Sequence, residues 1–549
     1  MTVPMLHKIK ATTRNIACGS FVYDWRLRGH TPDALIVKPV DPWAGDSENG
    51  HTLCAEGSFA IDGDRLTLRG ECWEPVGVDA AWLDHMHGFT WLRDLRALGG
   101  DSARHAARAM IASWIRHYEG WHKMAWRPDI AGERIALWIA HYDFFGADKN
   151  GGGDEFFQDQ FFESLVRQAR HVRRSLPGDT HGLAALKTIK GLLYAGVAFE
   201  GYELWIEHAL EQLETEIARQ ILSDGSHASR SPQQLLLALQ ILLDIRGALT
   251  AAGYPAPDYL QHAIDRAGPA VRFFRYGDKH FGLFNGAQEN DASFIDAVLA
   301  QASAGSRPLS SLPSAGFERV TLGRTLLLMD CGKVPTYPHD QSAHAAPLSF
   351  ELCYGKERIF VNCGSHPSSA DWQDSLRATA AHNTLSIDHR NACEIRGDGH
   401  FARKVKVSSS LREETKSACL LEATHDGYMA INGMTHRRRL FLTDQGHDLR
   451  GEDILNAAVV PTHPLQVAIR FHIHPRVLVS LVQDSAEALL RLPTGIGWRF
   501  HQCGGVLALE DSVYLGQGGR PRKTRQLVVY TEVTTEHASI RWALQREGL

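Results

Sequence analysis

The stretch Ser303-Ala-Gly-Ser-Arg-Pro-Leu-Ser-Ser-Leu-Pro-Ser-Ala-Gly316 separates two parts of the sequence that differ in periodicity. Its serine, proline and glycine content is typical of a linker. Before it, apolar residues recur at helical spacing, as in Ile206, Leu210 and Leu213. After it, short alternating segments bounded by turn residues predict antiparallel strands. The sequence therefore predicts a helical part followed by a strand-rich part.

The segments that predict helices all precede the linker, and short loops join them. Many amphipathic helices with short connections favour antiparallel pairs, in a bundle or an α/α toroid. The predicted helices are Asp79–Leu98, Ser102–Tyr118, Pro128–Phe145, Glu155–Arg174, Leu183–Phe199, Tyr202–Leu222, Pro232–Leu249, Pro257–Arg275 and Ala292–Ala302. Residues 1–78 predict a β-rich, irregular lead-in with a hairpin near Phe59. The predicted domains are thus 1–78, a helical domain at 79–302, a linker at 303–316 and a strand domain at 317–549.

Alternating segments dominate the strand domain. Leu348–Leu352 and Arg358–Asn362 flank a turn, which predicts a hairpin, and His436–Thr443 with the segment from Leu449 predicts another. Turn signals about every 8–12 residues favour an antiparallel β-sandwich. His436-Arg-Arg-Arg439 places charge on both strand faces, so we interpret it as a solvated or edge strand.

Composition and charge exclude several classes of protein. The 549 residues include 58 Lys and Arg against 63 Asp and Glu, a formal charge of −5, which argues against a general nucleic-acid binder. The nine cysteines are odd in number and form no Cys-x-x-Cys pair, which argues against a disulfide framework. The N-terminus lacks the apolar core of a signal peptide, and no run of about 18 apolar residues occurs. We therefore expect no membrane span and a cytoplasmic protein, or a periplasmic or exported one if a signal was removed.

Three motifs in the strand domain carry a family resemblance. They are Ser342-Ala-His-Ala-Ala-Pro-Leu-Ser-Phe-Glu-Leu352, Val361-Asn-Cys-Gly364 and Ala380-Ala-His-Asn-Thr-Leu385. Together with the helical part and the linker, they resemble the heparinase II/III-like polysaccharide lyases. The resemblance implies an α+β multidomain fold, with an incomplete α/α toroid followed by an antiparallel β-sandwich.

The resemblance also implies a reaction, which is β-elimination at a uronic acid. A base removes the proton on C5, an acid protonates the leaving glycosidic oxygen, and polar groups neutralise the sugar carboxylate. The expected substrate is then an acidic, uronate-containing bacterial polysaccharide or oligosaccharide. We expect no nucleic-acid partner, and a homodimer stays open.

Carried over residue by residue, the helical part supplies three candidate catalytic residues. His181 keeps the histidine of an Asn-His pair that contacts the carboxylate in the family, and Thr180 replaces the asparagine. His227 and Arg230 come just before a predicted helix start, where free backbone N–H groups favour an anion. Gln234 stands where the family has a catalytic tyrosine, and glutamine cannot donate that proton. Its capping position at the start of the helix is a sufficient alternative role.

The strand domain supplies the other candidates. His344 and His382 are expected at the catalytic cleft, although Ser342 replaces a histidine that is catalytic in the family. The resemblance also makes these two histidines weak zinc ligands. Asn362 replaces the third, acidic ligand, and zinc prefers histidine, cysteine and carboxylate, so we expect no metal and no cofactor. The candidate substrate-binding residues are Asn383, Arg377, His339 and Arg470.

Two other functions stay open. A glycoside hydrolase on the same scaffold would need two carboxylates about 5–10 Å apart. The candidates in the helical part are Asp94, Glu133, Asp179 and Asp224. A non-catalytic carbohydrate-binding relative would explain the replacements at Gln234 and Ser342.

Overall fold

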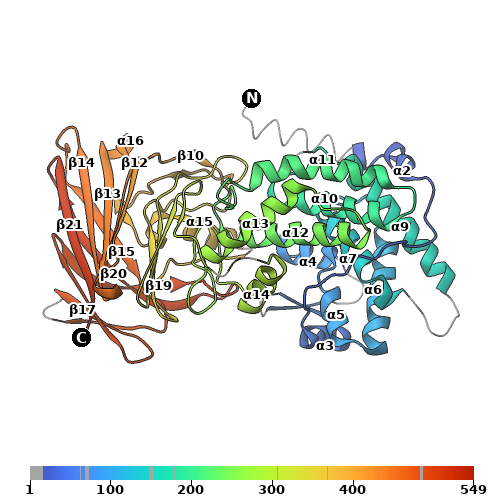
Figure 1. Cartoon of the computed structure of the whole chain (residues 1–549), viewed down its shortest axis with the longest axis horizontal. Helices are drawn as coiled ribbons and strands as arrows, with labels where there is room; N and C mark the ends of the chain where they lie inside the picture. The colour runs from blue at the N-terminus through green and yellow to red at the C-terminus, as the bar shows by residue number, and fades with distance from the viewer. Residues whose placement is uncertain are drawn as a thin grey trace. The chain divides into compact units, whose positions relative to one another are not determined.

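The computed structural model describes residues 17–61, 64–68, 73–146, 154–178, 180–303, 305, 307–367, 369–482 and 486–548 (Figure 1). It consists of two compact units: Met1–Arg219 with Gln240–Ile264, and Gln220–Leu239 with Asp265–Leu549. The first unit is mainly helical, and the second holds the large sheets. The predicted mixed architecture of a helical part before a strand-rich part is therefore confirmed. The predicted domain limits, toroid and sandwich stay predictions.

The helices before the linker follow the predicted periodicity closely. They are α2 (Phe21–Leu27), α3 (Ser47–Glu56), α4 (Ala80–Gly88), α5 (Leu92–Leu98), α6 (Gly100–His117), α7 (Pro128–Ala140), α8 (Tyr142–Phe145), α9 (Asp154–Arg174), α10 (Gly182–Ala198), α11 (Glu203–Gln220), α12 (Pro232–Ala251), α13 (Asp258–Phe273) and α14 (Ala292–Gln301). Two predicted helices are each divided in two. Phe89, with a φ of 61°, separates α4 from α5, and His141 separates α7 from α8.

Tryptophans and glycines explain the packing of the helical unit. Trp91, Trp114 and Trp138 are at most 1% exposed, so they fill the core. Helices α7 and α10 cross so closely that a Cβ on Gly191 would lie 2.3 Å from the Cα of Gly132. The separation of packed helices depends on the side chains at the contact, so a larger residue here would push them apart.

The N-terminal part differs from its prediction. The expected hairpin is present as β1 (Ser58–Ile61) and β2 (Asp64–Thr67), which pair antiparallel. Helices α2 and α3 were not predicted. Asp46 caps α3 by accepting the N–H of Glu48 at 2.8 Å, and Gly57 ends it in the left-handed conformation. An Asp cap followed eleven residues later by glycine is a signal that could have located this helix.

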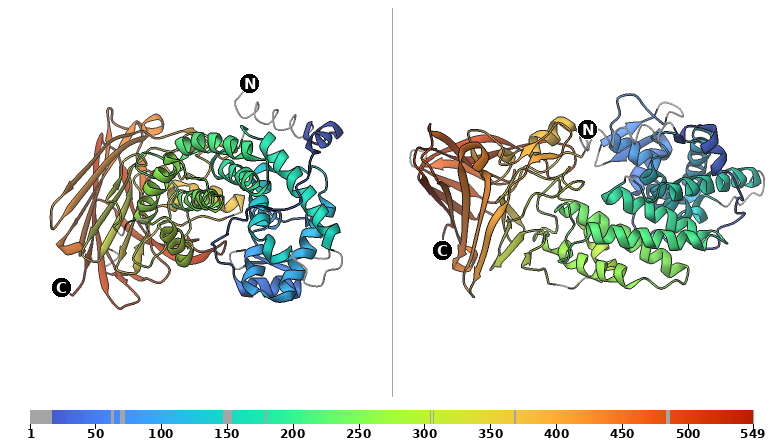
Figure 2. Two further views of the ribbon diagram at one scale, coloured as in Figure 1. Left: turned by 45° about the vertical axis from the view of Figure 1, so that its right-hand side comes forward. Right: turned by 90° about the horizontal axis from the view of Figure 1, so that it is seen from above.

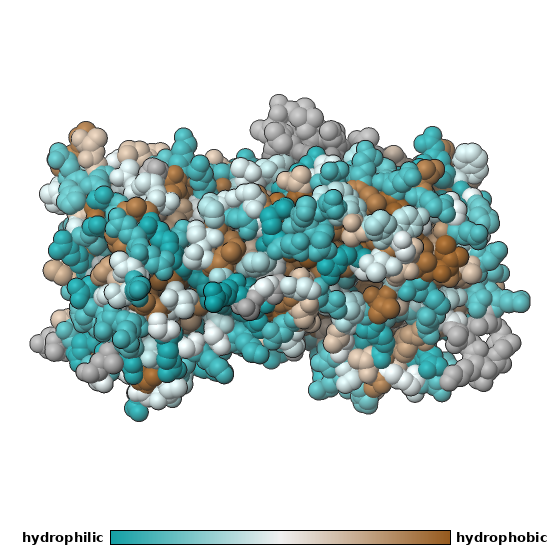
Figure 3. Space-filling view, viewed as in Figure 1, coloured by the Kyte–Doolittle hydropathy of each residue, from teal (hydrophilic) through white to brown (hydrophobic). Residues whose placement is uncertain are grey.

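One described helix, α12, is long and apolar enough to cross a membrane by length and composition. Of its most apolar window, 61% is buried inside the protein, as in the core helix of a globular fold. The face of the protein in Figure 3 is mainly hydrophilic, with apolar residues scattered among polar ones. Such scattering is normal for a protein surface.

The strands of the second unit pair antiparallel and form three large sheets. One sheet has the order β3 (Ser311–Leu312), β4 (Phe317–Leu322), β5 (Thr325–Asp330), β6 (Phe350–Tyr354), β7 (Glu357–Phe360). The second has the order β19 (Val506–Tyr514), β20 (Arg522–Val533), β15 (Leu465–His472), β8 (Leu385–Ile387). The third has the order β11 (Val407–Glu414), β12 (Cys419–Tyr428), β13 (Met434–Thr443), β14 (Asp448–Ala457), β21 (His537–Arg546), β18 (Gly497–Cys503), β17 (Glu487–Arg491), β16 (Leu478–Val482). Its strands, orange to red, form a twisted layer in Figure 2. Strands β6–β7 and β13–β14 confirm the two predicted hairpins.

The charged strand β13 lies between β12 and β14, so the prediction of an edge strand is wrong. Its alternation divides the charges between two faces. Arg437 and Arg439 are 39% and 42% exposed, whereas His436 and Arg438 are fully buried. Both buried side chains contact Asp453 on β14, at 2.7 Å from His436 Nε2 and 2.7 Å from the charged Arg438 Nε. The buried charges are therefore paired, and pairing is the condition under which a core tolerates them.

Candidate functional site

The start of α12 carries the first group of predicted site residues. Ser231 caps the helix by accepting the Gln234 N–H at 3.5 Å, and Pro232 is its first residue, as predicted. Asp224 closes the turn before it, because its carboxylate accepts the N–H groups of Ser226 at 3.1 Å and Ser314 at 2.7 Å. Only the backbone N–H of Gln234 takes part in this cap, and the Ser231 N–H donates to Ser229 Oγ at 3.3 Å. Asp224 is occupied by the turn rather than available as a hydrolytic carboxylate.

Arg230 lies inside the protein. Its guanidinium pairs with Asp330 at the end of β5, and its Nε donates to the Ala315 carbonyl at 2.6 Å. The Phe317 ring lies 4.6 Å from it. A Cβ on Gly332 would come within 2.3 Å of the guanidinium, so only glycine allows this close approach. This geometry makes Arg230 a structural partner and gives no support to its predicted contact with a substrate carboxylate.

His227 is 2% exposed and is held on both sides of its ring. Nδ1 accepts the Ser229 N–H at 3.1 Å, which leaves Nε2 as the donor to Gln220 Oε1 at 3.2 Å. Burial lowers the pKa of His227 to about 3, so the ring is neutral. Its edge meets the ring of half-buried His339, with 5.7 Å between centroids. The structure thus brings together one predicted catalytic and one predicted binding histidine.

His344 and His382 form a buried pair in which each ring nitrogen has a partner. His344 Nε2 accepts the Gly286 N–H at 2.8 Å, so the proton of that ring is on Nδ1. Nδ1 lies 2.7 Å from His382 Nε2 and donates to it. His382 then carries its proton on Nδ1, which donates to the Ala378 carbonyl at 2.9 Å. One arrangement of protons satisfies the whole series.

Burial also sets the charge of this pair. It lowers the pKa of His344 well below its ordinary value and that of His382 to about 4. Both rings are therefore neutral near pH 7. Because their lone pairs accept hydrogen bonds, neither ring can act as a base without breaking the series.

The side chains of Asn383 and Asn362 form hydrogen bonds with backbone groups, which gives no support to a contact with a ligand. Asn383 donates through Nδ2 to the Phe350 carbonyl at 2.8 Å and accepts the His472 N–H at 2.6 Å. Asn362 Oδ1 accepts the Asn383 N–H at 3.2 Å, and both residues are fully buried. These contacts connect β6, β8 and β15 and account for the asparagines of two of the three motifs.

Glu351, the acidic residue of the first motif, has a similar connecting role that was not predicted. It accepts the Tyr276 hydroxyl at 2.8 Å, the Asn362 N–H at 2.8 Å and the Leu283 N–H at 3.2 Å. Burial raises its pKa to about 7, although nearby Arg358 opposes the shift. The motif thus fixes the end of β7 and the segment near Leu283.

The remaining predicted residues have different surroundings. Arg377 is buried and donates to the Ala343 carbonyl at 2.8 Å and the Asp340 carbonyl at 3.1 Å. Arg470 is buried on β15 and donates to Ser386 Oγ at 2.7 Å. His181 directly precedes α10 in the first unit and is half-buried. Of this set, Arg377 lies close to the candidate site, because it supports the backbone before His344.

Residues 336–341, the 336–341 loop, hold side chains that reach the surface. Tyr337 is 46% exposed, and His339 follows two residues later. Asp340 anchors the loop: its carboxylate lies 2.6 Å from His400 Nδ1 and 3.2 Å from Lys404 Nζ. Burial raises the Asp340 pKa, but the His400 and Phe401 hydrogen bonds and Lys404 outweigh it and keep the pKa below its usual value. Tyr337, Asp340 and His400 were not predicted as site residues. In the sequence, the polar residues around His339 are the signal that could have indicated Tyr337 and Asp340.

The other predicted carboxylates are only partly available. Glu133 lies 3.0 Å from buried Lys190, and Lys190 lowers the pKa of Glu133 to about 2 against the effect of burial. Asp94 accepts the Asp46 N–H at 2.8 Å, and burial raises its pKa to about 6. Asp179 lies outside the described residues. None of these contacts forms the pair of open carboxylates that glycoside hydrolysis needs.

The zinc ligands implied by the resemblance do not fit a metal. Both rings of the His344–His382 pair use their lone pairs, and the Asn362 side chain is bonded to Leu283 and Asn383. Within the described ranges, no group of three or more His, Cys, Asp or Glu side chains could hold a metal ion. Zinc requires such ligands with free electron pairs.

We therefore predict that the purified protein contains well under one zinc per chain. Elemental analysis after dialysis measures this directly, and a His382→Ala variant should contain the same small amount. One zinc per chain that disappears in His382→Ala would contradict the hydrogen-bonded arrangement.

Sequence comparisons place the chain in a family. The Heparinase II/III N-terminus model matches residues 104–304, and the Heparinase II/III-like, C-terminal model matches 304–543. FtsZ-localized protein C of Caulobacter vibrioides (strain NA1000 / CB15N) is 31% identical over 535 residues, which cover 94% of this chain and 91% of that protein. The chain belongs to the heparinase II/III-like family. The resemblance carried by the three motifs is thereby confirmed.

Solved structures in this family share the fold. Heparinase III superposes with a TM-score of 0.72 at 15% identity and covers 99% of this chain and 92% of its own. Heparan sulfate lyase HepC of Pedobacter heparinus has a TM-score of 0.62 at 16% identity, with 91% of this chain and 82% of its own covered. At such identities the likeness shows the fold alone, so the chemistry must come from the residues present.

Proposed function

We propose that the protein is a lyase that cleaves a uronate-containing polysaccharide or oligosaccharide by β-elimination. Membership of the heparinase II/III-like family supports this function, and so does the fold shared with heparinase III over nearly the whole chain. The proposal includes the incomplete α/α toroid and the antiparallel β-sandwich that the family resemblance implies, and a cytoplasmic location.

The reaction needs one base and one acid. The C5–H bond breaks and its proton passes to the base, while the electron pair forms the C4–C5 double bond. The C4–O bond breaks, and the leaving oxygen takes a proton from the acid. Carbon, oxygen and protons balance without an oxidant or a cofactor.

The 336–341 loop offers the groups for these transfers. His227, His344 and His382 are buried and bonded through both ring nitrogens. His339 is half-buried instead, and Tyr337 beside it in the chain is 46% exposed. The proposal rests on this observation: a histidine and a tyrosine near the surface share one loop, which buried Asp340 anchors. His339 is the proposed base and Tyr337 the proposed acid.

The first test measures the unsaturated product. Incubation with heparan sulfate, chondroitin, alginate and pectate should yield ultraviolet absorbance from the C4–C5 double bond with at least one polymer. His339→Gln and Tyr337→Phe should each reduce turnover by about a hundredfold or more, the size expected for losing proton transfer. Their melting temperatures should stay near that of the unchanged protein.

A matched control comes from the same unit. His463 is a histidine whose side chain is 66% exposed, and His463→Gln should keep full turnover. Full turnover in both loop variants would contradict the assignment. New reducing ends without the double bond would indicate a glycoside hydrolase instead.

A second candidate is a non-catalytic carbohydrate-binding protein. Gln234 and Ser342 replace the two family residues that transfer protons, and the full burial of His344 and His382 favours a structural use of the motif. The similarity to FtsZ-localized protein C makes localisation with FtsZ part of this alternative. Saturable binding of an acidic polymer without any unsaturated product would favour it, and a fluorescent fusion would test the location.

A further inference from the structure

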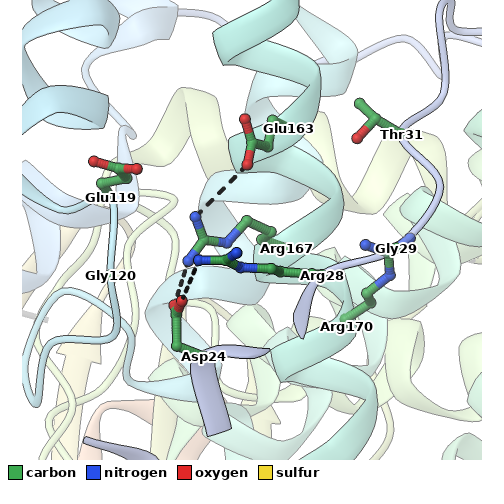
Figure 4. Close-up of a pocket in the computed structure, with 9 residues that line it drawn as sticks. All are labelled: Asp24, Arg28, Gly29, Thr31, Glu119, Gly120, Glu163, Arg167 and Arg170. Carbon is green, nitrogen blue, oxygen red and sulfur yellow. Dashed lines mark hydrogen bonds and ion pairs between the residues drawn. The ribbon is translucent and has the colours of Figure 1, made fainter. Parts of the chain in front are cut away.

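A polar pocket of about 470 Å³ lies in the first unit, and none of the predicted site residues lines it (Figure 4). This volume is within the range of small-molecule sites. Three arginines, three carboxylates, one threonine and two glycines line it: Asp24, Arg28, Gly29, Thr31, Glu119, Gly120, Glu163, Arg167 and Arg170.

One face of α9 builds the pocket wall. Glu163, Arg167, Arg170 and Arg174 are spaced by four, three and four residues, so their side chains emerge from the same face. Arg167 pairs with Asp24 of α2, and Arg170 donates through Nη1 to the Leu27 carbonyl at 2.9 Å. Arg174 donates to the Arg26 carbonyl at 2.9 Å. The arginines therefore hold the segment that forms the opposite wall.

Arg167 carries an unused donor. Its side chain is 8% exposed, and its Nε–H has no hydrogen-bond partner among the described residues. The nitrogen itself has no exposed surface, so Arg167 shapes the wall through Asp24 and Glu163 and leaves the ligand contact to exposed Arg28. A carboxylate is the strongest common acceptor for an arginine N–H.

The charges of the pocket restrict the ligand. Arg28 is 61% exposed and lies 3.7 Å from Asp24, so its guanidinium can turn toward a ligand. Glu163 is 61% exposed and only 3.9 Å from Arg167. The three arginines and three carboxylates balance to a formal charge of zero. A phosphate or a sulfated polymer would meet these carboxylates with several negative charges, whereas a molecule with one carboxylate and several hydroxyls can satisfy both kinds of group.

We propose that this pocket binds a sugar acid, as one uronate unit of an oligosaccharide. The sugar carboxylate accepts from the exposed Arg28 guanidinium, and the sugar hydroxyls donate to Glu119 and Glu163. Thr31 adds a hydroxyl at the rim. The site lies in the first unit, whereas the proposed proton-transfer residues lie in the second, so this binding does not require the proposed reaction.

Calorimetric titration of the full chain tests the proposal. The probes are a galacturonate trisaccharide and its methyl ester, which has the same rings and hydroxyls but no negative charge. We expect the acid to bind at least tenfold more tightly than the ester. Arg28→Ala should weaken binding of the acid at least tenfold, which corresponds to the loss of one charge-assisted hydrogen bond.

Arg104→Ala is the matched control, because Arg104 lies on α6 outside the pocket lining and pairs with Asp101 at 3.4 Å. It should bind the acid like the unchanged protein. Arg28 is largely exposed, so Arg28→Ala should leave the fold intact. Equal affinity for acid and ester, or unchanged affinity in Arg28→Ala, would overturn the proposal. Calorimetry reads binding alone, so a failure here is distinct from a failure of His339-dependent turnover.

Discussion

Replacing Arg230 with alanine should lower the free energy of unfolding by about 3–5 kcal/mol, because the change leaves the buried Asp330 carboxylate without its cation. The Ala315 carbonyl also loses its donor, and the Phe317 ring loses the contact with the guanidinium. Denaturant unfolding measures the difference. The effect on turnover should follow the amount of folded protein, since Arg230 does not reach a ligand.

The stability lost in Arg230→Ala should depend on pH. Burial already raises the pKa of Asp330, and Arg230 opposes that shift, so the pKa rises further in Arg230→Ala. A carboxyl with a folded pKa above its unfolded value takes up a proton on folding, and its unfavourable effect grows as the pH rises. The variant should therefore be weakened more at about pH 8 than at about pH 5.

Two comparisons make this test specific. Ser231→Ala removes only the cap of α12 and should cost about 1 kcal/mol. Combining Arg230→Met with Asp330→Leu removes both charges and should recover much of the lost stability. An Arg230→Ala protein that is fully stable but inactive would restore Arg230 to the catalytic site.

Asp453→Ala should have an effect of similar size on the large sheet. Asp453 is fully buried and accepts from His436 Nε2, Arg438 Nε and Trp542 Nε1, the last at 3.0 Å. Arg438 also donates to the Asn383 carbonyl at 2.6 Å, so the carboxylate supports a connection to β8. Removing it leaves a buried arginine uncompensated, for which about 3–5 kcal/mol is expected.

At acidic pH, the difference in the free energy of unfolding between Asp453→Ala and the unchanged protein should become smaller. Burial raises the Asp453 pKa, but Arg438 and His436 outweigh it and hold the pKa well below the usual value. Stability from a lowered pKa is present above the unfolded value and is lost as the pH falls through the folded value. Asp511→Ala is the control, because Asp511 is 91% exposed and its loss should change stability little. Equal unfolding curves for Asp453→Ala and the unchanged protein would contradict the buried network.

Local patterns in the sequence predicted the helices and strands but not the tertiary contacts that surround each of them. Apolar spacing placed α6 and α9 to α14, and the helix predicted from Pro232 begins where α12 does. The position of β13 within its sheet could not be predicted, because it depends on pairing with β14 and on Asp453, whose partner is 15 residues away in sequence. Alternation of charge alone does not distinguish a solvated face from a paired, buried one.

The candidate site was predicted less well than the fold. The sequence analysis selected His227, His339, His344 and His382 as candidate site residues. In the structure His227 contacts His339, and His344 contacts His382. What the sequence could not show is that Gly286 and Ala378 occupy the ring nitrogens of one pair. Backbone partners carry no signature in residue type, so the hydrogen bonds of a buried histidine cannot be predicted from sequence.

The path of the chain has a consequence for the evolution of this family member. The chain changes compact unit three times, at 219/220, 239/240 and 264/265. A fragment that begins at 304, where the two family models meet, would lack residues 220–239 and 265–303 of the second unit. The two parts that meet at residue 304 are therefore not independent folding units. Gene fusion or recombination at that border would separate pieces of one compact unit, so a swap there should disrupt folding of the second unit.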